Sequence, residues 1–417
     1  MSTKPAVDFT TQIVHADRWG GAEKGAIHQA IHSSVQYGYD QVEDLIAVFQ
    51  GTAKGGYNYA RQGTPTTAAL EAKITQMEGG TGSIVFSTGM AALCAMFFTL
   101  LKAGDHLVAS KFVFGNTNSV FGTLADLGVQ VTTVDATDAA QVQAAVRPNT
   151  RMVFVETIAN PGTQVPDLEG IGALCRDKGL LYVVDNTVAS PYLFRPATVG
   201  AGLVMNSLTK SIGGHGDALG GAITDTGLFD WAGYPNIFEA YRKGDPKSWG
   251  LQQVRKKGLR DMGGTLASHS AHQIAVGAET LALRMERSSA TALTTTVKAS
   301  SAHSSGSSSA KVLPLSMMPR TMRKKCVSGS TSPIHCAQRG MPANGNMKPL
   351  SSIDGRKKNS VICTACNWLR ASVLKVKPTA RLATMNTPIM APSSGRLPTM
   401  GTANSTQAAP RITISCT

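Results

Sequence analysis

Between residues 83 and 224 the chain alternates short, continuously apolar segments with segments of helical character. A short apolar segment bounded by polar residues is typical of a strand that is buried on both faces. Strands that alternate with helices predict an α/β fold with a mainly parallel sheet and helices on both of its faces. The seven expected strands are residues 83–86, 106–110, 129–134, 152–156, 180–185, 203–207 and 221–224.

The expected helices follow from apolar periodicity and from capping residues. Thr64 is suited to cap a helix that begins at Pro65 and ends before Gly79-Gly80. An N-terminal arm precedes it, with a short helix at residues 42–49, and residues 225–260 are expected to be rich in loops. The other expected helices are residues 91–101, 115–127, 138–146 and 168–178, followed by one long helix over 265–291.

Polar residues follow several of the expected strands, at the edge of the sheet where ligands of parallel sheets bind. Each has a structural explanation when it stands alone, because strand ends often carry surface lysines, hydrogen-bonded carboxylates and turns that bind nothing. Together they place an amine, carboxylates, hydroxyls and a helix N-terminus at one edge. The residues concerned are Thr88, Gly89, Met90, Glu156, Asn160, Asp185, Ser207, Thr209 and Lys210.

One cofactor, pyridoxal 5′-phosphate (PLP), would use all of these groups. Its aldehyde needs a lysine, for which Lys210 is the candidate, and we expect that amine to be held out of bulk water. Its pyridine nitrogen needs a carboxylate, for which Asp185 is the candidate. Its ring needs a flat apolar cover, which Phe114 can supply. A hydroxyl–glycine turn before a helix is a natural phosphate site, and here it contains Gly89, Met90 and the nearby hydroxyls of Ser207 and Thr209.

Tyr59 and Arg61 form a polar pair in a loop just before the helix that starts at Pro65. One interpretation is a surface arginine beside a packed tyrosine. The other is a guanidinium and a phenol that are directed at an anion.

These residues stand in five motifs whose order and spacing resemble the cystathionine γ-synthase-like (Cys/Met metabolism) PLP-dependent enzymes. The motifs are residues 59–66 (YARQGTPT), 87–90 (STGM), 156–161 (ETIANP), 185–187 (DNT) and 206–210 (NSLTK). The resemblance runs from about residue 8 to about residue 292 and implies PLP fold type I, the fold of aspartate aminotransferase. It implies an arm (1–56), a PLP-binding large domain (57–262) and a long connecting helix (263–292), with a tail (293–417) where the family has a small domain.

The resemblance also implies a role for each matching residue. Lys210 would bind PLP covalently and carry protons, Asp185 would pair with the pyridinium, and Asn160 would lie near the substrate carboxylate or the ring oxygen. The expected phosphate ligands are Gly89, Met90, Ser207 and Thr209. Tyr59, which is also assigned to the catalytic set, and Arg61 would reach the phosphate of a neighbouring subunit. That arrangement implies a homo-oligomer, which in this family is usually a tetramer built from two dimers.

Phe114 departs from the family, because many relatives have a stacking tyrosine there. Phenylalanine cannot donate a proton, so the substitution favours a leaving group that needs little acid assistance. The expected reaction is γ-replacement on O-succinyl- or O-acetylhomoserine by cysteine or sulfide, giving cystathionine or homocysteine. The alternatives are a methionine or cystathionine γ-lyase that yields 2-oxobutyrate and ammonia, and an inactive PLP-binding remnant.

Charge and cysteine content limit the compartment in which the protein is expected and the partners that it is expected to have. The net charge of +14 comes from the end of the chain, because residues 291–417 hold 17 Lys+Arg and a single acid, Asp354. The preceding part is close to neutral, and its two cysteines, Cys94 and Cys175, suggest a reducing compartment. No apolar segment is long enough to span a membrane. We therefore expect a cytoplasmic enzyme of amino-acid metabolism with small-molecule substrates, with no metal and with neither nucleic acid nor membrane as a partner.

The tail from residue 293 to residue 417 does not match the family and has three interpretations. A disordered basic extension could bind nucleic acid, but it lacks interleaved aromatic residues. A zinc site at Cys363 and Cys366 lacks a second pair of ligands with suitable spacing. A reading-frame shift near residue 293 explains the simultaneous loss of acids, aromatics and family motifs, and it is the interpretation we favour. The test is to translate the gene in its other two frames and to look for the missing Ser-Leu-Gly segment and arginine.

Overall fold

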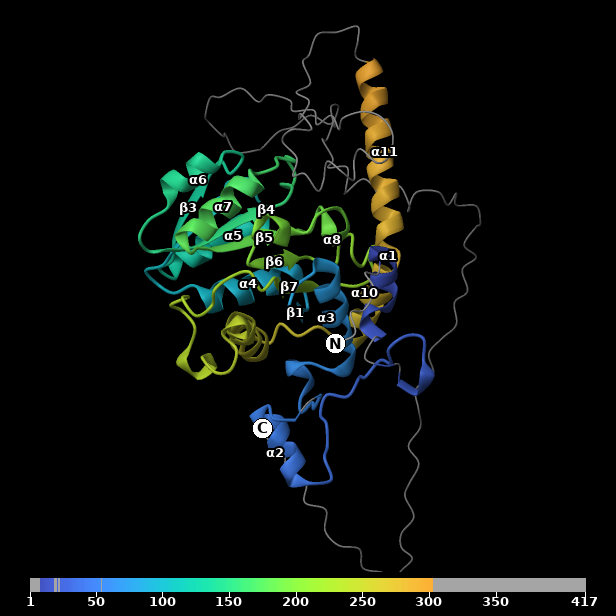
Figure 1. The fold of residues 1–417 in the computed structure, drawn as a ribbon. Coiled ribbons are helices and arrows are strands. Elements are labelled where there is room, and N and C mark those ends of the chain that lie inside the picture. The colour runs from blue at the N-terminus through green and yellow to red at the C-terminus, as the bar shows by residue number, and fades with distance from the viewer. Residues whose placement is uncertain (1–7, 19–20, 22, 54, 303–417) are drawn as a thin grey trace, which may run out of the picture. The chain divides into compact units, whose positions relative to one another are not determined.

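The computed structural model describes residues 8–18, 21, 23–53 and 55–302, with side chains as far as residue 292. Its centre is a seven-stranded sheet in the order β1-β7-β6-β5-β4-β2-β3 (Figure 1). All strands are parallel except β7, which is antiparallel to both of its neighbours. The strands are β1 (Gly82–Phe86), β2 (His106–Ser110), β3 (Gln130–Val134), β4 (Thr150–Glu156), β5 (Leu181–Asp185), β6 (Leu203–Asn206) and β7 (Gly221–Asp225).

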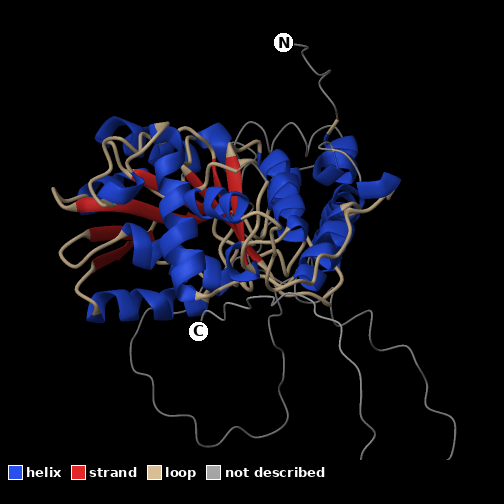
Figure 2. Ribbon diagram, turned by 90° about the horizontal axis from the view of Figure 1, so that it is seen from below, coloured by secondary structure: helices blue, strands red, loops and turns tan. Residues whose placement is uncertain are grey.

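Helices cover both faces of the sheet, which confirms the predicted α/β class (Figure 2). One face packs against α4 (Gly89–Leu100), α5 (Gly115–Asp126) and the π-helix η7 (Val254–Arg260). The other packs against α3 (Pro65–Glu78) and α10 (Ser268–Ala278) near β7, and against α6 (Ala139–Ala145) and α7 (Leu168–Lys178) near β4 and β5. The strands read as continuous apolar runs because their alternate side chains enter different cores, as Val183 and Val184 of β5 do.

The helices next to the strand ends begin and end where their capping residues predict. The Thr64 hydroxyl accepts a hydrogen bond from the N–H of Thr67, Pro65 opens α3, and Gly79 ends it in the left-handed region with φ of 69°. In α4 the Thr88 hydroxyl accepts from the N–H of Ala91. In the arm, the short helix α2 (Val42–Gln50) confirms the prediction for residues 42–49.

Residues 226–248 are loops and short 3₁₀ turns, as expected for a segment rich in loops. The last part of the segment differs from that expectation, because it is helical, with α9 (Trp249–Gln253) continuing into η7. Its buried positions include Gly250, Gln253 and Gly258, and such small or polar residues give no apolar periodicity. The single helix expected over residues 265–291 is two helices, α10 and α11 (Leu281–Ala302), with Glu279 and Thr280 between them.

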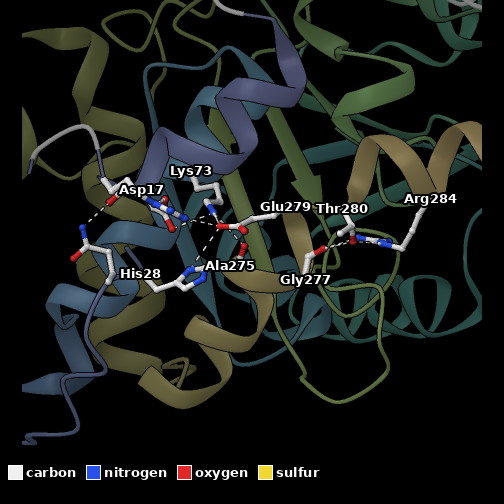
Figure 3. Close-up of polar contacts among 10 residues, drawn as sticks. Asp17, His28, Lys73, Ala275, Gly277, Glu279, Thr280 and Arg284 are labelled. Atoms are coloured by element: carbon white, nitrogen blue, oxygen red, sulfur yellow. Dashed lines mark hydrogen bonds and ion pairs between the residues drawn. The ribbon is translucent and has the colours of Figure 1, made fainter. Parts of the chain in front are cut away.

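The break between α10 and α11 is occupied by an ion-pair cluster around a buried lysine (Figure 3). The Lys73 side chain is fully buried, and its Nζ lies 3.0 Å from Asp17 Oδ2 and 3.4 Å from Glu279 Oε1. It also donates a hydrogen bond to the carbonyl of Ala275. Arg18 contacts both carboxylates, at 3.2 Å from Asp17 and 2.5 Å from Glu279. The cluster therefore joins the N-terminal segment, α3 and the start of α11.

The helices in the described part of the chain include none that is both long and apolar enough to cross a membrane. Within the same residues, no three side chains of His, Cys, Asp or Glu are grouped so that they could hold a metal ion. The tail discussed above, with its cysteines, lies outside the described residues from position 303 onward.

Candidate active site

Lys210 lies in the turn that follows β6. Its N–H donates to the carbonyl of Ser207, and its own carbonyl accepts from the N–H of Gly214. The turn lifts Lys210 away from the sheet, and its side chain is exposed in the described chain, so the expectation of an amine held out of bulk water is not met.

Arg284 of α11 holds the turn that carries Lys210. Its guanidinium donates to the carbonyls of Ser211, Ile212 and Gly277. Gly214 has φ of 76°, and a side chain there would collide with this guanidinium. The Lys210 turn is thus fixed to the first turns of α11, which lies far from it in the sequence.

Two carboxylates lie side by side at the ends of neighbouring parallel strands. Glu156 ends β4 and Asp185 ends β5, and the two residues are register partners. Glu156 accepts a hydrogen bond from the N–H of Phe114 at 2.6 Å, and Asp185 accepts one from the N–H of Thr187 at 2.9 Å. Both residues are buried, at 5% and 8% exposure.

Burial dominates the ionisation of this pair. It raises the pKa of Asp185 and that of Glu156, and the neighbouring charge of Asp185 raises the pKa of Glu156 further. Among the described residues, Asp185 accepts hydrogen bonds from Thr187 and forms no ion pair. A cationic group beside Asp185 would therefore find an unpaired, buried carboxylate to stabilise it.

The turn before α4 lies against the end of β6. A side-chain carbon on Gly89 would lie only 2.9 Å from Ser207 Cβ and 3.1 Å from Ser207 Oγ, so glycine is what allows this approach. Gly221, at the start of β7, likewise has no room for a side chain against the backbone of Thr88 and Gly89. The N–H groups of Gly89 and Met90 occupy the first helical positions, which have no intrahelical partners. These N–H groups and the Ser207 hydroxyl together fit an anion.

Thr209 and Ser207 differ in how their polar groups are used. The Thr209 hydroxyl donates to the carbonyl of Gly220 at 3.2 Å and accepts from the N–H of Gly220 at 3.0 Å. Ser207 uses its backbone N–H, which donates to Thr187 Oγ1 at 2.8 Å. The hydroxyl of Ser207 is therefore the better placed of the two to bind a ligand.

Phe114 and Asn160 flank the carboxylate pair. Phe114 precedes α5, and its ring is 43% exposed, while its backbone is held by Glu156. Asn160 follows β4 and donates its backbone N–H to the same carboxylate. Glu156 thus positions both residues through their main chains.

Tyr59 and Arg61 lie apart from this group in the described chain. The Arg61 guanidinium stacks 5.3 Å from the Tyr59 ring centre and donates to the carbonyl of Arg260 at 2.6 Å. The Tyr59 side chain is 38% exposed. The structure therefore brings together the strand-end residues within one chain but not this pair.

A family model described as "Cys/Met metabolism PLP-dependent enzyme" matches residues 10–299. The chain belongs to this family. The O-acetyl-L-homoserine sulfhydrylase of Corynebacterium glutamicum is 36% identical over 296 residues, covering 67% of each chain. The L-methionine γ-lyase of Pseudomonas deceptionensis is 33% identical over 283 residues, covering 67% of this chain and 65% of that protein. The chain thus spans about two thirds of the length of these relatives.

The solved structures support the same family and its cofactor. A structure described as an O-acetylhomoserine (thiol)-lyase of Campylobacter jejuni has a TM-score of 0.64 and 26% identity, covering 69% of this chain and 74% of that one. It carries N′-pyridoxyl-lysine-5′-monophosphate. The cofactor of the Cys/Met metabolism family is PLP.

The strand-end residues of this family member fit PLP on geometric grounds. Asp185 is a buried carboxylate without an ion-pair partner among the described residues, as a pyridinium requires. Gly89 leaves the space beside Ser207 in which backbone N–H groups can meet a phosphate. Lys210 stands on the next strand end beyond Asp185, since β5 and β6 are neighbours.

Several residues that shape the site had no assigned role before the structure. Glu156 appears in the sequence only as an acid after an apolar strand, and its hold on Phe114 joins residues 42 positions apart. No sequence pattern indicates a role for Arg284, because its hydrogen-bond partners in the Lys210 turn are backbone carbonyl groups. Glu78, the last residue of α3, gave one weak signal: an acid at a helix C-terminus is electrostatically unfavourable.

Proposed function

We propose that this protein catalyses PLP-dependent γ-replacement on an O-acylhomoserine, with sulfide or cysteine as the incoming thiol. With O-acetylhomoserine and sulfide, the Cγ–O bond breaks, a Cγ–S bond forms, and the products are homocysteine and acetate. The observation that carries the proposal is the buried carboxylate of Asp185, which forms no ion pair among the described residues and ends the strand next to β6, the strand that leads to the Lys210 turn. The relatives named O-acetyl-L-homoserine sulfhydrylase support the substrate class, whereas the L-methionine γ-lyase relative supports the alternative reaction.

Each strand-end residue has a proposed part in this reaction. PLP, when bound, supplies an electron sink for the negative charge that develops on the amino-acid substrate. Lys210 holds the cofactor and carries protons between the substrate carbons Cα and Cβ. Asp185 keeps the pyridine nitrogen protonated, because a buried carboxylate favours a neighbouring cation. The proposed phosphate ligands are the N–H groups of Gly89 and Met90 and the hydroxyls of Ser207 and Thr209, with Asn160 near the substrate carboxylate.

Phe114 favours the replacement of a good leaving group over the elimination of a poor one. Its ring is held beside the site through the hydrogen bond from its N–H to Glu156, and it has no hydroxyl to donate a proton. A carboxylate leaves from O-acetylhomoserine without protonation, whereas a thiolate leaving from methionine benefits from an acid. The site is therefore better suited to the activated ester than to the thioether.

The test is a direct assay of the full-length protein reconstituted with PLP. With O-acetyl- or O-succinylhomoserine, we expect homocysteine when sulfide is added and cystathionine when cysteine is added, measured by mass spectrometry. Release of 2-oxobutyrate and ammonia from methionine or cystathionine, without replacement, would instead identify a γ-lyase. Covalent binding of PLP without turnover of any of these substrates would identify a cofactor-binding remnant.

We also propose that the protein is cytoplasmic and forms a homo-oligomer. In this assembly the N-terminal arm of one copy contacts a second copy. The arm exposes large apolar side chains, including Ile27 at 75%, Val42 at 67% and Phe49 at 67%. Tyr59 and Arg61 follow directly and would reach the phosphate of the second copy. Light scattering should report at least a dimer, and Phe49→Ser together with Val42→Ser should shift it toward monomer. A wild-type monomer would contradict this part of the proposal.

A further inference from the structure

Behind the strand ends that carry Asp185 and Lys210 lies a buried carboxyl group with no part in the proposed reaction. Glu78 ends α3 and is 1% exposed, and it faces Asn186 and Asn206, both of which are fully buried. Glu78 Oε1 accepts from Asn206 Nδ2 at 2.6 Å and from Asn186 Nδ2 at 3.2 Å. Asn186 directly follows Asp185, and Asn206 directly precedes Ser207.

The hydrogen bonds of Glu78 are unevenly shared between its two oxygens. Oε1 receives both amide donors, while Oε2 has no hydrogen-bond partner among the described residues. The Oδ1 of Asn206 also has none. The two unpartnered atoms therefore belong to two groups that are already joined by the Asn206 Nδ2–Glu78 Oε1 bond. As a carboxylate, Glu78 would bring two acceptor oxygens to this pair of groups with no proton to share.

We propose that Glu78 is a protonated positioning residue, whose acid hydroxyl at Oε2 donates to Asn206 Oδ1 and whose Oε1 accepts from both asparagines. A carboxylic acid and a primary amide are complementary in this way, since each contributes one donor and one acceptor. The second bond would satisfy both orphaned oxygens, which is what buried polar groups require. The part of this inference that concerns PLP rests on the proposed function.

The side-chain amide of Asn186 cannot be flipped so that its oxygen, rather than its Nδ2 donor, faces Glu78. Its Nδ2 donates to the carbonyl of Phe194 at 2.8 Å, and that carbonyl can only accept. Its Oδ1 lies 2.9 Å from the hydroxyl of Thr157, and its backbone N–H donates to the carbonyl of Met205. The amide orientation that meets Glu78 with a donor is therefore fixed by its other neighbours.

The burial of Glu78 favours the neutral acid. Burial raises the pKa of Glu78 to about 7, while the hydrogen bonds from Asn206 and Asn186 and the charge of Arg195 lower it. Arg195 lies between α8 (Ser190–Leu193) and the 3₁₀ turn η4 (Pro196–Val199). Its guanidinium donates to the carbonyl of Met77 and to Gln12 Oε1 rather than to the carboxyl group of Glu78. The C-terminus of α3 adds the negative end of a helix dipole.

The acid would act on the cofactor site through the two strand ends that it joins. The asparagines are the residues next to Asp185 and Ser207, so holding their side chains fixes the backbone of β5 and β6 at that edge. Loss of the bridge would let the pyridinium carboxylate and the lysine turn move relative to each other. Glu78 would contact neither substrate nor cofactor.

The decisive experiment compares Glu78→Gln with Glu78→Leu in the protein without added cofactor and in the protein with PLP. Glutamine reproduces the neutral acid, because it offers one carbonyl and one N–H donor, whereas leucine removes both. By infrared difference spectroscopy between about pH 5.5 and about pH 8.5, the cofactor-free wild type should lose protonated-carboxyl absorption as pH rises, to which Glu156 and Asp185 also contribute and Glu78 adds one component. Glu78→Gln should lack that component, and the exposed control Glu169→Gln should retain it.

Stability provides the second readout and has a defined sign. Because the folded pKa of Glu78 is raised above its ordinary value of 4.5, its stabilising effect is complete below that value and is lost as pH rises through about 7. Glu78→Gln should therefore lose less stability than the wild type on going to alkaline pH. PLP affinity should be retained in Glu78→Gln and fall about tenfold or more in Glu78→Leu.

Two outcomes would overturn the proposal. One is an infrared difference spectrum that is the same for wild type and Glu78→Gln. The other is a loss of PLP affinity in Glu78→Gln as large as in Glu78→Leu, which would mean that the negative charge is needed. If PLP binds to none of the proteins, the proposed function fails, but the infrared and stability measurements still decide the state of Glu78.

Discussion

Replacing Lys210 with alanine is expected to abolish the visible absorption of a PLP Schiff base and to lower turnover by about 10²–10⁴-fold. The variant loses the covalent attachment and the proton carrier at the same time. Its fold should be unaffected, because Lys210 is exposed and the turn is held by main-chain bonds and by Arg284. Borohydride reduction followed by peptide mass spectrometry should place the pyridoxyl group on Lys210 in the wild type.

A matched lysine variant distinguishes this effect from the loss of any positive charge. Lys178 ends α7, is exposed, and has no part in the strand-end group, so Lys178→Ala should retain both the absorption and the turnover. A pyridoxyl group on a different lysine of the wild type would refute the assignment. So would a persistent Schiff-base band in Lys210→Ala.

The second large effect is on stability: Lys73→Met should lower the free energy of unfolding by about 3 kcal/mol. Methionine fills the space but leaves buried Asp17 without one of its two cationic partners, and the carbonyl of Ala275 without a donor. Arg18 still contacts Asp17 and Glu279, which is why a larger loss is not expected. Thermal unfolding of the full chain should show a midpoint about 6–12 °C lower.

A double-mutant cycle tests whether the ion pair itself causes that loss. Adding Asp17→Asn to Lys73→Met removes the unpaired charge, so the double variant should lose less stability than the two single losses added together. Lys178→Met, at an exposed position, should change the free energy of unfolding by about 0.5 kcal/mol or less. Additive losses would mean that the two side chains contribute independently.

The fold class was predictable because strands buried on both faces appear in the sequence as short, continuously apolar segments. The strand at 106–110 and the helix at 168–178 were predicted with the bounds that the structure has, since each lies between clear turn or cap residues. The predicted element bounds were wrong where tertiary contacts, rather than the local sequence pattern, determine the structure. Residues 265–291 carry an unbroken apolar stripe, whereas the break between α10 and α11 coincides with the ion pairs of Glu279 to Lys73 and Arg18 and with the hydrogen bond from Arg284 to the carbonyl of Gly277.

The site was predictable to the extent that its residues stand at strand ends. The sheet order brings the ends of β4, β5 and β6 together, so Glu156, Asp185 and Lys210 could be grouped before any contact was known. The contacts that orient them could not be inferred. Glu78 reaches Asn186 across 108 positions, and Arg284 reaches Ser211 across 73, and neither pair has a sequence pattern. The exposure of Lys210 was also missed, because it depends on the turn rather than on the strand.

The antiparallel strand β7 sets the spacing between β1 and β6. It lies between β1 and β6 and is antiparallel to both, so those two strands run in the same direction without touching. Their ends are therefore two strand spacings apart, about 9.5 Å, and the Gly89 turn crosses this gap to lie against Ser207 at the end of β6. Gly221, the first residue of β7, keeps the gap free of side chains at the edge. The strand order and the two glycines, rather than any polar side chain, therefore bring the N-terminus of α4 to the strand end from which the Lys210 turn starts.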